Sequence, residues 1–287
     1  MATLMKKKTK IKLIIFSAFV LLIITMNTFG NALKIEHYSL VSDKLTEPVR
    51  IVFISDLHNC TYGGSDQSGI WKKIQAEQPD LVLFGGDMID QYGGTSYALQ
   101  LMKMTKEAYP CAYTFGNHEM EREDRQEFYN EVEKLGIPIL HGNYTDVTVN
   151  GQALRISGFI HEYNNTDQFE SCCQSMDDDR YNVLLVHQPE QFESTVAECT
   201  KHGTAADLVL SGHAHGGQWR IPKILEHGLF APDQGLFPEF TCGQRTHGGV
   251  VQITSRGLAK PFRMLLIPRI FNRPELSVVE IQPSELP

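Results

Sequence analysis

Short apolar runs, several of them rich in β-branched residues, alternate with amphipathic stretches along the chain. We predict strands over residues 50–55, 80–86, 111–116, 153–159, 182–187, 207–212, 249–255 and 276–281. Residues 70–78, 96–108 and 124–136 have the apolar spacing of helices. Strands that alternate with helices indicate an α/β protein with a largely parallel sheet, and the strand-rich second half predicts added antiparallel strands. We therefore expect two packed sheets flanked by helices.

The chain shows no internal repeat, no low-complexity linker and no composition break after residue 34. Its 287 residues suffice for one large α/β domain. We predict a single globular domain over residues 34–287, preceded by a separate segment over residues 1–33.

The segment 1–33 is basic and then apolar. Five lysines precede the apolar run Leu13–Met26, and no acidic residue occurs before Glu36. The stretch from Ile11 to Phe29 approaches the length of a membrane span. We favour an uncleaved, single-pass membrane helix over a cleaved signal peptide, whose only support is a weak small-residue pattern near Gly30. The lysines would then remain in the cytoplasm and place the domain on the other side of the cell membrane.

Net charge separates two classes of function. The whole chain carries −8, but without Lys6, Lys7, Lys8, Lys10 and Lys12 the remainder carries −13. A protein that binds the nucleic-acid backbone needs a positive surface, so we expect no nucleic-acid partner. A small or lipid-linked anionic substrate is compatible with this negative charge, because bound metal can balance the charge of the substrate.

Six cysteines occur, and none forms a CxxC pair, which disfavours a thiolate zinc site. The even number permits disulfides, but the spacing fixes no pairing and leaves the compartment open.

Residues 216–249 interrupt the alternation of strands and helices. This connection is punctuated by glycine and proline, yet it carries Trp219, Phe230, Phe237 and other apolar residues. Connections of this length in a compact domain are usually functional or disordered, and the apolar content disfavours disorder. Two interpretations stay open, a substrate-contacting loop and an extra β-hairpin on the core.

Metal-binding side chains follow five of the predicted strands. They are Asp56, His58, Asp87, Asn117, His118, His187, His213 and His215. A single aspartate or histidine at a strand end commonly serves as a cap or turn former. In open α/β sheets, however, the carboxyl ends of the strands line the ligand crevice, so these residues are expected to share one site.

Without His118, the set comprises two aspartates, one asparagine and four histidines. Seven donors are too many for one tetrahedral zinc, but they suit two divalent ions if one carboxylate bridges them. Mixed imidazole and oxygen donors suit Mn, Fe, Zn or Ni.

Five ordered blocks in this chain resemble those of the calcineurin-like metallophosphoesterase superfamily. They are SDLH (55–58), GGDMID (85–90), GNHE (116–119), VHQP (186–189) and GHAH (212–215). The stretches GGQWRIP, FAPDQGLFPEF and SRGL resemble a narrower branch of membrane-associated bacterial phosphodiesterases, including enzymes similar to UDP-diacylglucosamine pyrophosphatases.

The resemblance implies a four-layer α/β/β/α sandwich and a role for each matching residue. Asp56, His58 and His215 would bind one metal, Asn117, His187 and His213 the other, and Asp87 would bridge both. His118 would not be a ligand but would stabilise the transferring phosphoryl group or protonate the leaving oxygen. Asp90 and Glu119 match positions that orient the ligands.

The expected activity is metal-assisted hydrolysis of a phosphate ester. The apolar segment 1–33 and the connection 216–249 favour a lipid-linked phosphodiester or pyrophosphate as substrate. A cell-envelope phosphodiester or a phosphoprotein are the alternatives for the same site. A metal-free scaffold that keeps the fold as a binding module is the alternative from another class.

Overall fold

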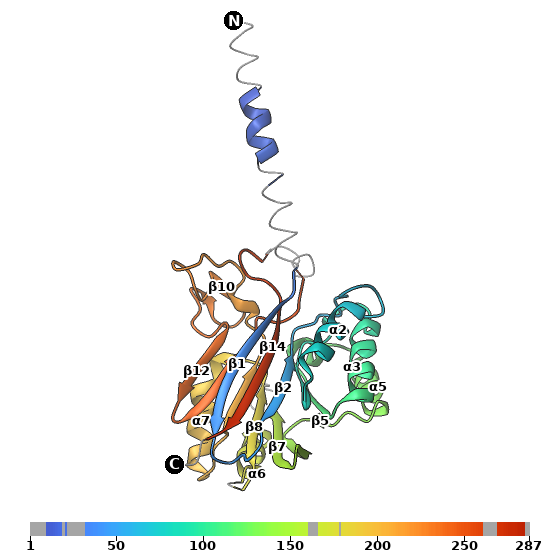
Figure 1. Ribbon diagram of the computed structural model, residues 1–287. Coiled ribbons are helices and arrows are strands. Elements are labelled where there is room, and N and C mark those ends of the chain that lie inside the picture. Colours follow the sequence, from blue (N-terminus) through green and yellow to red (C-terminus); the bar gives the residue numbers. More distant parts are fainter. Residues whose placement is uncertain are drawn as a thin grey trace, which may run out of the picture.

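The computed structural model describes residues 10–18, 21, 32–159, 166–177, 179–260 and 269–284, and two six-stranded mixed sheets form its centre (Figure 1). The first sheet has the order β1 (Lys34–Ser42), β14 (Glu275–Pro283), β2 (Val49–Ile54), β3 (Leu81–Gly85), β4 (Cys111–Thr114) and β5 (Ile139–Leu140). Its neighbouring strands are parallel except for β14 and β2.

The second sheet has the order β12 (Gly243–His247), β13 (Val250–Thr254), β9 (Leu208–Ser211), β8 (Tyr181–Val186), β7 (Gln152–Phe159) and β6 (Asn143–Val149). The four inner strands are parallel, and β12 and β6 pair antiparallel at the edges. All eight predicted strands are present, and the mixed α/β architecture is confirmed.

Helices cover the outer face of each sheet. α2 (Ser68–Glu77), α3 (Ser96–Ala108) and α5 (Arg125–Lys134) pack on the first sheet, close to their predicted bounds (Figure 1). α6 (Thr166–Ser175) and α7 (Phe192–Lys201) pack on the second and were not predicted. Three short helices, α4 (Asn117–Met120), η1 (Pro189–Gln191) and η2 (His215–Gly217), lie at strand ends.

Side chains on the two faces of β2 lie in two different hydrophobic cores, which explains why this sheet packs between helices and the second sheet. Val52 and Ile54 point into the core beneath α2 and α3, whereas Ile51 and Phe53 point into the core between the sheets. Because successive side chains of a strand face opposite sides, one apolar run is buried on both faces. Each such side chain contributes about 1.5–3 kcal/mol of burial free energy.

The connection 216–249 contains a two-residue antiparallel hairpin, β10 (Phe230–Ala231) and β11 (Gly235–Leu236). Its base is fixed to η2, since the Leu229 amide donates to the Gly217 carbonyl at 2.9 Å. Figure 1 shows β10 at the end of the molecule from which β1 begins. The connection therefore contains a hairpin, which was one of its two predicted forms.

The expected membrane helix of residues 1–33 is not supported by the part of the chain that the structure describes. Within that part, no helix combines the length and the apolar character needed to cross a bilayer. Residues 10–18 are helical with exposed side chains, including Leu13, Ile14 and Phe16. Residues 1–9, 19–20 and 22–31 of the predicted segment lie outside the described residues.

A disulfide joins the two helices of the second outer layer. Cys173 on α6 pairs with Cys199 on α7, and 26 positions separate them in the sequence. The neighbouring Cys172 is a free, buried thiol that donates to the Gly158 carbonyl at 3.2 Å. The sequence pattern permitted disulfides but could not select Cys173 over Cys172.

We expect the disulfide to stabilise the protein by about 3 kcal/mol, because it closes a loop of moderate length in the unfolded chain. Urea unfolding of the double variant Cys173→Ala/Cys199→Ala should show this loss, and a reductant should then have no further effect. Cys172→Ala is the matched control and should keep the response to reductant. Equal unfolding free energies for oxidised and reduced wild-type protein would contradict the prediction.

Candidate metal centre

The predicted site residues lie at the carboxyl ends of five parallel strands. Asp56 and Asp87 follow β2 and β3, and Asn117 begins α4 directly after β4. His187 follows β8, and His213 follows β9. Because both sheets present these ends at the same edge, residues far apart in the sequence meet there, as the strand-end argument predicted.

Of the groups of three side chains whose donor atoms lie close together, two contain six of the seven predicted ligands. One donor atom each from Asp56, His58 and His215 lie within 4.8 Å of one another, and Asp87, His187 and His213 form an equivalent group. Asp87 also belongs to a third group with His58 and His118. Its carboxylate therefore lies between donors of both groups, where a bridging ligand is required.

Backbone donors fix the two carboxylates. Asp56 Oδ1 accepts the His213 amide at 2.9 Å, and Asp87 Oδ1 accepts the His118 amide at 2.9 Å. The second oxygen of Asp87 lies 3.1 Å from His187 Nε2. Asp56 Oδ1 also lies 3.9 Å from Nε2 of both His187 and His215, so each aspartate faces histidines of the site.

Several buried polar atoms of the site have no hydrogen-bond partner among the described residues. They are Asp56 Oδ2, His58 Nε2, Asn117 Oδ1 and His187 Nε2, the last of which faces Asp87 in an ion pair. Leaving a buried donor or acceptor unpaired costs about 1–3 kcal/mol, so a cluster of such atoms in one site indicates a ligand. A carboxylate oxygen, an imidazole nitrogen and an amide oxygen are all metal donors, and the residues present therefore fit divalent cations.

Backbone strain is concentrated in the same residues. Five of the seven candidate ligands have a positive φ, namely Asp56, His58, Asp87, His213 and His215. This left-handed conformation is uncommon for residues with a side chain, and it persists where surrounding structure imposes it, often at functional sites.

Asp90 and Glu119 lie behind the candidate ligands. Asp90 Oδ1 is 2.6 Å from His58 Nδ1, which directs the other ring nitrogen into the site. The buried Glu119 carboxylate accepts the backbone amides of Asp87, Met88, Ile89 and Gly116. It thereby holds together the turns that follow β3 and β4.

His118 differs from the other histidines of the site. Its side chain is one-third exposed, and its Nδ1 accepts the Gln91 amide at 3.2 Å. Accepting at Nδ1 leaves the proton of the neutral ring on Nε2, which lies 3.9 Å from Asp87 Oδ2. His118 therefore presents an N–H donor on the edge of its ring that faces Asp87.

Burial and neighbouring charges shift the pKa values of three site histidines in different directions. Burial lowers the pKa of His213 and, together with the charge of His58, holds the pKa of His215 well below its usual value. Burial opposes the charged form of His187 too, but the adjacent Asp87 carboxylate raises its pKa to about 10. Without metal, His187 therefore carries a proton that a cation must displace.

The raised pKa of His187 predicts how the stability of the metal-free protein depends on pH. Its usual pKa is about 6.5 in the unfolded chain, so its stabilising contribution is complete below that pH. The contribution is lost as the pH rises towards about 10. Urea unfolding of chelator-treated protein should show decreasing stability between pH 6.5 and 9.5. His187→Gln should flatten this slope, and an unchanged slope would refute the assignment.

Sequence reasoning missed three residues that contact the candidate ligands. Gly257, from SRGL, lies so close to Asp56 that an added Cβ would approach the Asp56 Cβ to 2.5 Å. The guanidinium of Arg269 is buried, with Nη2 3.4 Å from His215 Nδ1. Asp233 accepts from His213 across the hairpin turn. The motifs that contain Gly257 and Asp233 could be recognised in the sequence, but the neighbouring residues did not indicate which candidate ligands they contact.

Comparison with known proteins assigns the class. Residues 49–217 match the family model described as calcineurin-like phosphoesterase, which covers more than half of the chain. The chain therefore belongs to the calcineurin-like phosphoesterase family. It is a metallophosphoesterase, a hydrolase of phosphate esters.

Two curated relatives and one solved structure show the extent of the similarity. The chain is 28% identical to the uncharacterized protein YpbG of Bacillus subtilis over 68% of its length and 72% of that protein. It is 26% identical to the phosphodiesterase YaeI of Escherichia coli over 82% of both chains. A 5′-nucleotidase precursor from Thermus thermophilus shares the fold at a TM-score of 0.50 and 14% identity, covering 74% of this chain and 50% of its own.

Proposed function

We propose that this chain is a phosphodiesterase with a dinuclear divalent metal centre. The observation that carries the proposal is the pair of donor groups, which a third group links through His58 and Asp87, together with buried donor atoms that have no hydrogen-bond partner among the described residues. Its similarity to a phosphodiesterase over most of both chains supports diester rather than monoester substrates.

In this proposal Asp56, His58 and His215 would hold one cation, and Asn117, His187 and His213 would hold the other. Asp87 would contribute a ligand to both. When bound, such cations activate water and neutralise the phosphoryl oxygens during in-line displacement. His118 donates from Nε2 to the phosphoryl group or to the leaving oxygen, while Asp90 and Glu119 hold the ligand-bearing turns.

The primary test is hydrolysis of bis-p-nitrophenyl phosphate by the full chain, stripped by chelator and then supplied with Mn²⁺, Fe²⁺, Zn²⁺ or Ni²⁺ in turn. We expect activity only after metal addition, and faster turnover than with p-nitrophenyl phosphate. A preference for the monoester would favour a phosphomonoesterase, including a protein phosphatase. Absence of both metal binding and activity would favour the metal-free scaffold.

We propose that the natural substrate is linked to a lipid. The hairpin that reaches His213 also exposes Leu236 and Phe237, at 66% and 71%, and Ile224 of the same connection is 80% exposed. Large apolar side chains grouped on a soluble surface are typical of contact with lipid or protein. Leu236 and Phe237 follow Asp233, the hairpin residue that contacts His213, so an acyl chain of a bound phosphodiester or pyrophosphate would extend towards this hairpin.

Vesicles that contain a phosphodiester-linked lipid test this part separately. Replacing Ile224 and Phe237 by serine should slow hydrolysis of the lipid and leave bis-p-nitrophenyl phosphate turnover unchanged. Equal rates on the lipid for both proteins would favour a soluble cell-envelope diester instead.

We further propose that the domain lies outside the cytoplasm, attached to the cell membrane by residues 1–33. The lysine-flanked apolar sequence and the Cys173–Cys199 disulfide support this location, because disulfides persist in oxidising compartments. Protease treatment of intact cells should degrade the domain, whereas full protection would refute the location. Release of the intact domain into the medium would favour a cleaved signal.

A further inference from the structure

The turn between β10 and β11 brings a carboxylate to a candidate metal ligand. Asp233 Oδ2 lies 2.9 Å from His213 Nε2, although 20 positions separate the residues. The His213 side chain is 4% exposed, and that of Asp233 is 47% exposed. The contact therefore joins a buried imidazole to a residue of the long connection that lies at the surface.

This contact determines which nitrogen of His213 can bind a cation. A carboxylate accepts, so the proton of the neutral ring belongs on Nε2, and the lone pair is left on Nδ1. His213 also belongs to the donor group with Asp87 and His187. With Nε2 engaged by Asp233, Nδ1 is the nitrogen available to that group.

Asp233 is held firmly enough to act in this way. The adjacent Gln234 side chain bonds to the backbone of Glu239 and Phe240, which closes the loop beneath the turn. At the base of the hairpin, Gly217 and Gly228 lie so close together that a Cβ on Gly217 would come within 2.8 Å of the Gly228 Cα. The start of the hairpin is thus fixed to η2, and its turn is braced against residues 239 and 240.

We propose that Asp233 is a positioning residue of the metal centre, which accepts the Nε2–H of His213 and thereby presents Nδ1 to the second cation. The inference rests on the proposed dinuclear site. It assigns part of the connection 216–249 to the metal centre itself, so that the hairpin with the exposed apolar side chains also sets the affinity of one metal. Carboxylates that orient a ligating histidine typically change metal affinity 10- to 100-fold.

The test compares the full-length wild-type protein with Asp233→Ala, Asp233→Asn and the charge-matched control Glu226→Gln, an exposed residue of the same connection. Titration with Mn²⁺ should show two sites in the wild type and the control. In Asp233→Ala the dissociation constant of one site should rise 10- to 100-fold while the other stays unchanged, and Asp233→Asn should be intermediate because its amide oxygen still accepts. Circular dichroism and thermal melting establish that each variant folds.

A second readout needs neither metal nor substrate. Nitrogen-15 NMR of the metal-free wild type should show His213 protonated on Nε2, and Asp233→Ala should populate both tautomers. Unchanged dissociation constants together with an unchanged tautomer would overturn the inference and leave the proposed function intact. A wild type that binds no metal would instead overturn the proposed function.

Discussion

Asp87→Asn should reduce kcat/KM for a phosphodiester by at least ~10³-fold, which corresponds to about 4 kcal/mol of transition-state stabilisation. Asparagine keeps the shape of the side chain but removes the charge that lies between the two donor groups. One Asp87 oxygen accepts the His118 amide, and the other faces His187, so both halves of the site should be disturbed together. Steady-state kinetics and elemental analysis of bound metal measure the two effects.

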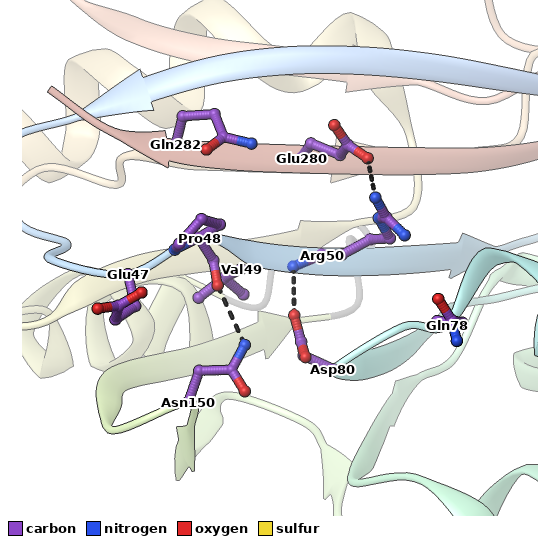
Figure 2. A pocket seen from close by; sticks show the side chains of 9 residues that line it. All are labelled: Glu47, Pro48, Val49, Arg50, Gln78, Asp80, Asn150, Glu280 and Gln282. Atoms are coloured by element: carbon purple, nitrogen blue, oxygen red, sulfur yellow. Dashed lines mark hydrogen bonds and ion pairs between the residues drawn. The ribbon is translucent and has the colours of Figure 1, made fainter. Parts of the chain in front are cut away.

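Asp80→Asn is the matched control, because it removes the same charge at the opposite end of β3. Asp80 accepts the Arg50 amide at 2.7 Å (Figure 2), and both residues line a polar pocket of about 320 Å³ together with Glu280. This pocket lies at the amino ends of β2 and β3, away from the candidate ligands. The control should keep its metal and activity. An Asp87→Asn protein with full metal content and normal turnover would refute the bridging role.

The strand ends were predictable from the sequence because they depend on local pattern. An apolar run followed by a glycine and a metal-capable side chain locates the end of a strand, and parallel strands align their ends. Asp87 after β3 and His213 after β9 could therefore be assigned to one site without knowing which sheet holds each strand. That β3 and β9 lie in different sheets made no difference, since both sheets open towards the same edge.

The supporting residues were not predictable, because their roles depend on contacts between distant segments. Arg269 looks in the sequence like an ordinary surface cation, yet it is buried against Gly257 and His215. Strand β1 pairs with β14 across most of the chain, so its membership of the first sheet has no local signal. Asp233 shows the same limit, because hydrophobic periodicity does not describe a turn within an irregular connection.

His118→Gln should lower kcat about 10²- to 10⁴-fold for a diester with an alkyl leaving group, while both metals remain bound. The reason is the geometry of the ring, whose Nδ1 accepts the Gln91 amide and whose Nε2–H lies towards Asp87 and the candidate ligands. An alkoxide leaving group needs a proton, whereas p-nitrophenolate leaves readily without one. The loss should therefore be much smaller with bis-p-nitrophenyl phosphate if His118 acts as an acid.

The comparison of leaving groups separates the two roles that His118 can have. A donor that only stabilises the phosphoryl oxygens would affect alkyl and nitrophenyl diesters equally, and a metal ligand would lose bound metal when replaced. His37→Gln, on β1 and paired with Glu77, is the control for removing a histidine and should leave both rates unchanged. Loss of metal from His118→Gln would show that the third donor group, with His58 and Asp87, binds a cation through His118, and would refute its assignment as a donor.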